Sequence, residues 1–143
     1  MSHKLHAILR TLAWLESQER YDPDGGFSYW PFHLDGSTVL GSHMATLFPL
    51  TCTHGARLVV KHLGGVVLGY AEGKNPEAMA GRGRVNDGDT NIGHDFAVVG
   101  EYLVDYWLLA TYGMPQFGIL HLEHDAMEIR RLYGPIEHWE ELP

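Results

Sequence analysis

The feature that most constrains the fold of this sequence is a turn signal between two short apolar segments, within the stretch from His94 to Trp107. The segments are 96–99 (FAVV) and 102–104 (YLV), and Gly100-Glu101 stands between them. A glycine at the first central position is typical of the type II′ turn that joins two antiparallel strands. The pattern therefore predicts a β-hairpin over His94 to Trp107.

The register of this hairpin decides which side chains meet. With Gly100-Glu101 as the turn, the expected cross-strand pairs are Val99–Tyr102, Phe96–Asp105 and His94–Trp107. Side chains alternate between the faces of a strand, so one face would carry His94, Phe96, Val98, Leu103, Asp105 and Trp107. His94 and Asp105 then become diagonal neighbours about 7–8 Å apart, within reach of each other's side chains. A shift of one residue would place them on opposite faces.

Two helices are expected before the hairpin. Residues 3–18 repeat apolar side chains at helical spacing, as do residues 51–63, which include Cys52. Gly64-Gly65 follows the second segment, and glycine is the usual residue just beyond a helix end. Thr51 is a suitable N-cap, which would place Cys52 in the first helical turn.

Shorter elements complete the expected chain. They are an extended edge segment over 27–32, a buried strand over 66–70, a long surface loop over 73–93, a strand over 118–122 and a short helix over 124–133. Pro31 confines the first of these to a sheet edge. We expect one α+β domain over residues 1–143, with an N-terminal helix and a Cys-bearing central helix packed on a small antiparallel sheet.

Composition excludes several classes of protein. The apolar share of 45% and the charged share of 20% are those of a globular chain. A net charge of -8 argues against nucleic acid as a partner, since phosphate binding needs a basic surface. No run approaches the ~18 apolar residues that span a bilayer, and the first residues do not resemble a signal peptide. A single cysteine forms no internal disulfide, which favours a cytoplasmic location.

Cys52 has two interpretations. A lone cysteine on the apolar side of a helix is often an inert, buried packing residue. At a helix N-terminus, however, backbone N–H groups and the helix dipole favour the thiolate, which is the reactive form. The same N–H groups can bind the oxyanion that forms during acyl transfer. The predicted hairpin adds the imidazole of His94 and the carboxylate of Asp105. An activated thiol needs such a pair, because the imidazole acts as the base and the carboxylate orients it.

The arrangement resembles the papain-like superfamily in its broad sense, which includes transglutaminase-like and bacterial effector-type thiol hydrolases. The resemblance covers about residues 50–107 and is carried by the motifs TCTHGA at 51–56, GHDFAVV at 93–99 and LVDYW at 103–107. It implies that Cys52 is the nucleophile, His94 the general base and Asp105 the orienting acid. No Gln or Asn upstream of Cys52 matches a side-chain oxyanion donor, and Ser42, His43 and Thr51 remain candidates for that role.

Two functions from different classes follow. The first is a cysteine-dependent hydrolase or acyltransferase that acts on an amide-type bond of a protein or peptide, as a peptidase, amidase, deamidase or transglutaminase-like enzyme without a cofactor. Trp107 and His54 are its candidate substrate-binding residues; we expect His54 to face solvent and to be able to act as a second base. Loop 73–93 would border the cleft. The second is a small acidic binding protein, such as an immunity, inhibitor or anti-defence factor, that uses negative surface on a basic partner.

A metal site is the weaker alternative. His121 and His124 lie three residues apart, but they straddle an expected junction between strand and helix. Zinc needs three or four converging ligands. The run DGDTN at 87–91 has the start of a calcium loop, but Val98 stands where such a loop requires glutamate. We therefore expect no metal site.

Overall fold

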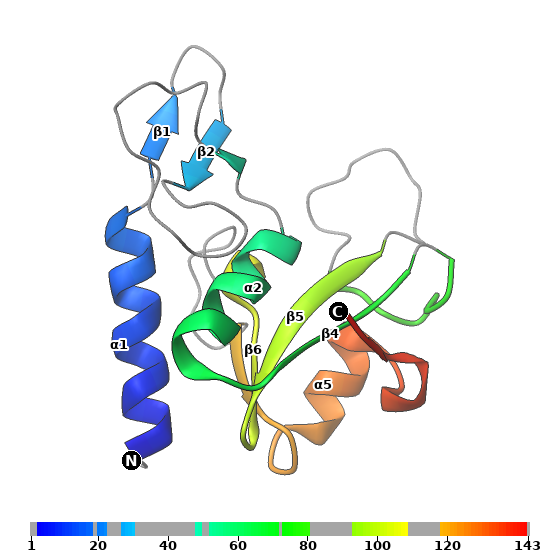
Figure 1. Cartoon of the computed structure of the whole chain (residues 1–143). Coiled ribbons are helices and arrows are strands. Elements are labelled where there is room, and N and C mark those ends of the chain that lie inside the picture. Colours follow the sequence, from blue (N-terminus) through cyan, green and yellow to red (C-terminus); the bar gives the residue numbers. More distant parts are fainter. Residues whose placement is uncertain are drawn as a thin grey trace.

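An antiparallel sheet with helices on both faces forms the framework of the protein in the computed structural model (Figure 1). The structure describes residues 3–18, 20–22, 27–30, 48–49, 52–71, 73–80, 93–108 and 118–142. The fold is α+β, as predicted, and the helix that carries Cys52 packs on the sheet. Among the described residues, no helix combines the length and the apolar character that crossing a membrane requires.

The main sheet has five strands in the order β7-β6-β5-β4-β8. Every neighbouring pair is antiparallel. Its strands are β4 (Val66–Tyr70), β5 (His94–Val99), β6 (Tyr102–Val104), β7 (Ile119–His121) and β8 (Glu140–Glu141). Strand β5 lies in the middle, and its buried, β-branched character is typical of a central strand.

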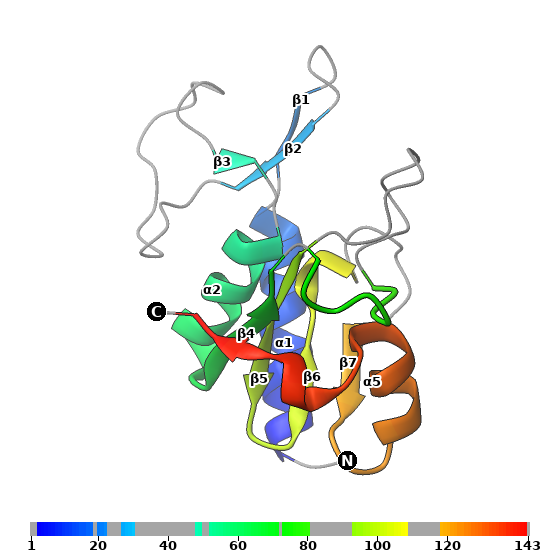
Figure 2. The same ribbon diagram turned by 90° about the vertical axis from the view of Figure 1, so that its right-hand side faces the viewer.

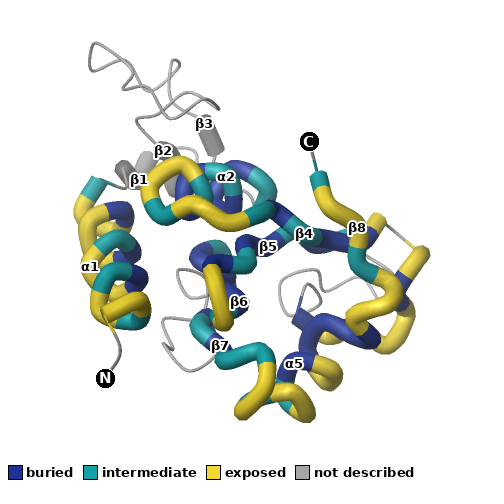
Figure 3. Tube along the Cα trace, turned by 60° about the horizontal axis from the view of Figure 1, so that its bottom comes forward, coloured by how far each residue is buried: buried dark blue, intermediate teal, exposed yellow. Residues whose placement is uncertain are grey.

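The helices lie on opposite sides of this sheet (Figure 2). Helices α1 (His3–Gln18) and α2 (Cys52–Leu63) cover one face, and α5 (Ala126–Tyr133) covers the other. The short η3 (Ile136–His138) follows α5. A hydrophobic core lies on each face of the sheet, and alternate residues of β5 contribute to one or the other. Ala97 and Val99 pack toward α1 and α2, and Phe96 packs toward α5. Figure 3 shows buried residues along the central strands and exposed residues on the outer side of α1.

The predicted hairpin forms with the predicted turn. Val99 pairs with Tyr102, and Gly100 has φ 59°, in the left-handed region that a glycine adopts at little cost. The second strand is shorter than predicted, because the described pairs end at Ala97–Val104. The Asp105 N–H instead donates to the Gly118 carbonyl, and residues 106–108 form a helical turn. The expected pairs Phe96–Asp105 and His94–Trp107 are therefore not part of the ladder.

A second, three-stranded sheet has the order β1-β2-β3, with β1 at Arg20–Asp22, β2 at Phe27–Trp30 and β3 at Phe48–Pro49. The extended segment was correctly expected, but its placement at an edge was wrong, because β2 pairs on both sides. The strand ends at Trp30, so the ring of the next residue, a proline, does not interrupt the ladder.

One other expectation needs correction. Ala78 and Ala80 lie in the segment expected to be a surface loop, but both are buried in the core beside α5. Backbone N–H groups of Met79 and Ala80 donate to the Leu132 carbonyl and fix the segment there. The acidic tail also forms strand β8, which the sequence did not predict, because a two-residue strand has too few residues to show alternation.

Candidate active site

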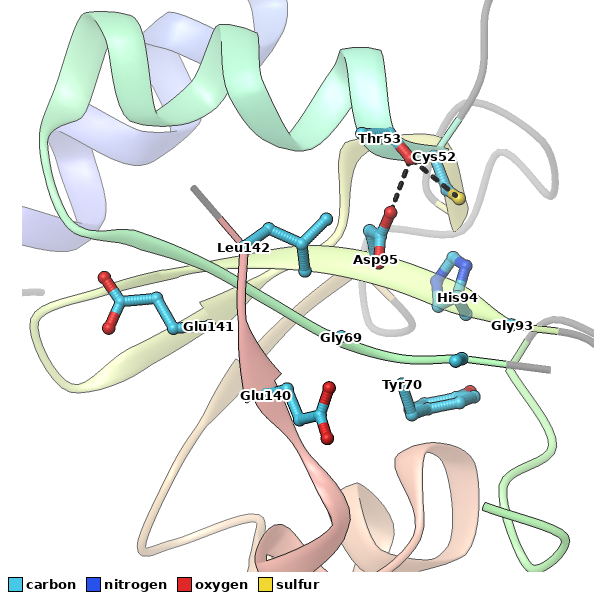
Figure 4. Close-up of a pocket in the computed structure, with 11 residues that line it drawn as sticks. Cys52, Thr53, Gly69, Tyr70, Gly93, His94, Asp95, Glu140, Glu141 and Leu142 are labelled. Atoms are coloured by element: carbon cyan, nitrogen blue, oxygen red, sulfur yellow. Dashed lines mark hydrogen bonds between the residues drawn. The ribbon is translucent and has the colours of Figure 1, made fainter. Parts of the chain in front are cut away.

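Three elements bring the predicted trio to one end of the main sheet. Cys52 is the first residue of α2, His94 is the first residue of β5, and Asp105 directly follows β6. The hairpin turn at Gly100 fixes the two strands in the register that puts His94 and Asp105 on one side. In Figure 4 the Cys52 sulfur and the His94 ring lie beside each other at the edge of a cavity. Cys52, His94 and Asp105 therefore meet.

The ion pair of His94 and Asp105 is the most deeply buried part of the trio. Nε2 of His94 lies 2.6 Å from Oδ2 of Asp105, and the side chains are 2% and 1% exposed. The Leu108 N–H donates to Oδ1 of Asp105 at 3.0 Å, which caps the helical turn 106–108. The Tyr133 hydroxyl donates to Oδ2 at 2.8 Å. Both carboxylate oxygens therefore have donors, as a buried charge requires.

Aromatic rings surround the imidazole of His94. The ring of Trp107 lies 5.1 Å away, Tyr133 stacks at 6.0 Å, and Tyr70 lies at 6.4 Å, between ring centroids. Burial alone would lower the pKa of His94, but the charge and hydrogen bond of Asp105, together with Cys52, outweigh it and raise this pKa to about 10. The imidazole is therefore protonated at neutral pH.

Cys52 is a free, half-buried thiol beside this imidazolium. Burial alone would raise its pKa, but a hydrogen bond with His94, the charge of His94 and a backbone hydrogen bond from Asp95 together lower it. The start of α2 adds backbone N–H groups without intrahelical acceptors. The lowered pKa of Cys52 and the raised pKa of His94 favour a thiolate beside an imidazolium, with the proton on His94.

Asp95 and Thr53 form a contact that the sequence analysis missed. The Thr53 hydroxyl donates to Oδ2 of Asp95 at 2.5 Å, linking the first turn of α2 to β5. The charge of Asp95 opposes the lowering of the Cys52 pKa, whereas its backbone N–H supports it. The sequence did contain a signal for this contact, because side chains alternate between the two faces of a strand. Asp95 follows His94, so its side chain lies on the other face of β5, toward α2.

A cavity of about 440 Å³ opens in front of Cys52. Its lining comes from α2, β4, the start of β5 and the C-terminal strand: Cys52, Thr53, Gly69, Tyr70, Ala71, Gly93, His94, Asp95, Glu140, Glu141 and Leu142. Gly69 pairs with Asp95 on one side and with Glu140 on the other. A Cβ atom at Gly69 would overlap Oδ1 of Asp95 and lie 2.7 Å from the His94 carbonyl. The close approach of β4 to the site therefore requires glycine here.

The two predicted substrate-binding residues do not line this cavity. His54 is 2% exposed, so the expectation that it faces solvent was wrong. It lies on the inward side of α2, where the helix packs on the sheet. Trp107 packs on the His94 ring instead and shields the ion pair. Of the loop expected to border the cleft, Gly93 does line the cavity. Ser42, His43, Thr51 and residues 81–92 lie outside the described residues.

The described residues contain no group of three or more side chains able to hold a metal ion. The rings of His121 and His124 stack with centroids 3.9 Å apart. Nδ1 of His121 accepts backbone N–H groups from Glu123 and His124, which commits that nitrogen to the turn. The acidic run 87–91 lies outside the described part of the chain.

Tyr133 is a further site residue that the sequence did not reveal. It stands 28 positions from Asp105 and on a different element, so no local spacing links the two. Its position on the inner side of α5 marked it only as a core residue.

No family model, no curated protein and no solved structure matches this chain. The functional argument therefore rests on the arrangement of Cys52, His94 and Asp105.

Proposed function

We propose that the protein is a cysteine-dependent hydrolase or acyltransferase that acts on an amide-type bond. The observation that carries the proposal is the buried His94–Asp105 pair beside a thiol of lowered pKa, at the mouth of a cavity. If His94 had only a structural role, it would not need to lie at a cavity. If Cys52 had only a packing role, it would not need a neighbouring imidazolium. Strongly shifted ionisable groups that converge on a cavity are typical of active sites.

The reaction follows from the positions of the protons. The Cys52 thiolate attacks the carbonyl carbon of the substrate, a C–S bond forms, and the carbonyl π electrons move to oxygen. The His94 imidazolium then donates its proton to the leaving nitrogen as the C–N bond breaks, which leaves a thioester and a neutral imidazole. Water, or an amine in a transfer reaction, attacks the thioester carbon and gives a proton to His94. The C–S bond breaks and the thiolate returns.

The start of α2 is the proposed oxyanion site. The backbone N–H groups of its first turn have no intrahelical acceptors, and the dipole there favours negative charge. A carbonyl oxygen bound beside Cys52 would accept from these groups as its charge develops. This assignment needs no Gln or Asn side chain upstream of Cys52.

Relationship to the papain-like superfamily remains a part of this proposal. Support comes from the order of elements, with the thiol at a helix N-terminus, the base at the start of β5 and the acid directly after β6, the second strand of the same hairpin. The cavity dimensions suit one or two side chains of a peptide substrate, so we propose a protein or peptide amide as substrate. A cytoplasmic location fits the single free thiol.

A trapping experiment tests the proposal. The protein is incubated with a nitrophenyl ester and with a library of peptide coumarylamides, and intact mass and peptide mapping follow the adducts. We expect an acyl group on Cys52, and turnover that is abolished by Cys52→Ser and by His94→Gln. Folded wild-type protein that forms no acyl adduct, or a Cys52→Ser variant with equal turnover, would overturn the proposal and favour the alternative of a small acidic binding protein.

A further inference from the structure

Oδ2 of Asp105 has two donors from different parts of the chain. His94 approaches it from β5 at 2.6 Å, and the Tyr133 hydroxyl approaches it from the last turn of α5 at 2.8 Å. The Tyr133 side chain is fully buried, and its ring stacks on the His94 ring at 6.0 Å and 23°. One tyrosine therefore contacts both members of the ion pair.

The backbone of Tyr133 is also fixed. Its carbonyl accepts a hydrogen bond from Nδ2 of Asn75 at 2.7 Å and another from Nε1 of Trp139 at 2.9 Å. The side chain of Asn75 is itself buried and closely approaches Gly134, at the end of α5. Asp105, Asn75 and Trp139, from three segments of the chain, thus all form hydrogen bonds with Tyr133.

We propose that Tyr133 is a positioning residue of the thiol site, which orients the Asp105 carboxylate and limits the negative charge that this carboxylate presents to His94. The inference rests on the proposed function and adds a fourth residue to it. A hydrogen bond to a carboxylate draws electron density from the accepting oxygen, so the shared Oδ2 binds the His94 proton less strongly than an unshared oxygen would.

The balance matters because His94 must give up its proton. An imidazolium held too strongly by Asp105 would be a poor acid toward the leaving nitrogen. Tyr133 can moderate this pair throughout the working pH range, since burial and then the charge of Asp105 hold the pKa of its phenol well above the usual value. It therefore stays a neutral donor. Among the described residues, the other titratable groups that face His94 are Cys52 and Tyr70.

The test is Tyr133→Phe in the full chain, which removes the hydroxyl and keeps the ring that packs on His94. NMR of histidine-labelled protein gives the pKa of His94, assigned by comparison with His94→Gln. We expect this pKa to rise by about 0.5–1 unit, because hydrogen bonds to charged groups are among the stronger ones. Tyr102→Phe, at the turn end of β6 and so at the opposite end of the hairpin from His94, is the matched control and should leave it unchanged.

A second variant separates the proposed role from packing. In an Asp105→Asn background the same Tyr133→Phe change should no longer raise the pKa of His94, because Tyr133 acts through the carboxylate. Cleavage provides a second readout. Amide turnover should fall about three- to tenfold more than nitrophenyl ester turnover, since only the amide nitrogen needs a proton on leaving.

The outcomes are distinct from those of the proposed function. An unchanged or lowered pKa of His94 in Tyr133→Phe, or an equal rise in the Asp105→Asn background, overturns the inference. A wild-type thiol of ordinary reactivity overturns the function, whatever the NMR titration shows, because the titration does not depend on Cys52 reacting. Circular dichroism and urea unfolding establish that each variant is folded before its titration is interpreted.

Discussion

His94 lies at the start of one strand and Asp105 just beyond the end of the next, yet Nε2 and Oδ2 approach to 2.6 Å in a site almost closed to solvent. The contact joins residues 11 positions apart across a two-residue turn. It sets the charge of the imidazole and, through it, the state of the Cys52 thiol.

Asp105→Asn removes the charge that favours the imidazolium and keeps the shape of the side chain. We expect the pKa of His94 to fall by about 1–3 units, the usual effect of losing one close opposite charge, and the pKa of Cys52 to rise as the positive charge of His94 is weakened. Stopped-flow alkylation with iodoacetamide across pH measures the thiol. Glu123→Gln, on an exposed turn, is the control. An alkylation profile for Asp105→Asn that overlays the wild type would contradict this assignment.

The raised pKa of His94 makes the free energy of unfolding depend on pH. The effect is measured in Cys52→Ser, because this variant has no thiol whose own titration would add to it. The folded state keeps the His94 proton well above the ordinary pKa of 6.5, whereas the unfolded state releases it near 6.5. In Cys52→Ser the upper end of this window lies below the wild-type value of about 10, because Cys52 contributes to that value. Because the folded state then binds more protons, the free energy of unfolding is highest below pH 6.5. It should decline as pH rises through this window, by up to about 1.4 kcal/mol per pH unit.

Urea unfolding of Cys52→Ser at a series of pH values measures this decline. The double variant Cys52→Ser, His94→Gln should lack it, because glutamine does not titrate. Equal pH dependence in the two proteins would show that His94 does not hold its proton when folded.

Gly69→Ala tests the close approach of β4 to the site. The added methyl group would overlap the Asp95 carboxylate and press on the His94 carbonyl, so we expect a loss of about 1–3 kcal/mol in the free energy of unfolding and slower alkylation of Cys52. Gly55→Ala is the matched control, since its methyl group would meet nothing nearer than 3.7 Å. Unchanged stability and unchanged reactivity of Gly69→Ala would mean that the site is looser than the structure shows.

The carboxylates at the cavity should influence which electrophiles reach the thiol. Glu140 and Asp95 flank Gly69 on neighbouring strands, and both line the cavity with Cys52. Glu140→Gln removes one negative charge, so the rate of alkylation by anionic iodoacetate should increase relative to neutral iodoacetamide. The gain should shrink as salt is added. A ratio of the two rates that does not change would show that Glu140 does not act on the path to the thiol.

The elements around the site were predictable from sequence because each rests on local chemistry. The turn at Gly100 fixed the register of the hairpin, and the apolar spacing of 51–63 placed Cys52 at the start of a helix. These two features place His94 and Asp105 on one side of the hairpin and Cys52 at a helix N-terminus, and the packing of α2 on β5 then brings the three residues together.

The rest of the site depends on contacts between distant segments. Tyr133 reaches Asp105 from α5, and strand β8 supplies Glu140 to the cavity, and neither relation leaves a local pattern. His54 was expected to face solvent, but the side of α2 on which it lies faces the sheet. Tertiary packing determines the positions of Tyr133, Glu140 and His54. The periodicity of a helix or strand in the sequence does not show against which other segment that element packs.

The most direct test of the central claim is the pH profile of Cys52 alkylation in wild-type protein and in His94→Gln. The account predicts a wild-type thiol that reacts quickly at neutral pH, with an apparent pKa clearly below the ~8.5 of a free cysteine, and a variant in which this advantage is lost. A wild-type profile with an ordinary or raised pKa, or one that His94→Gln leaves unchanged, would contradict the claim that His94 and Cys52 form a reactive pair.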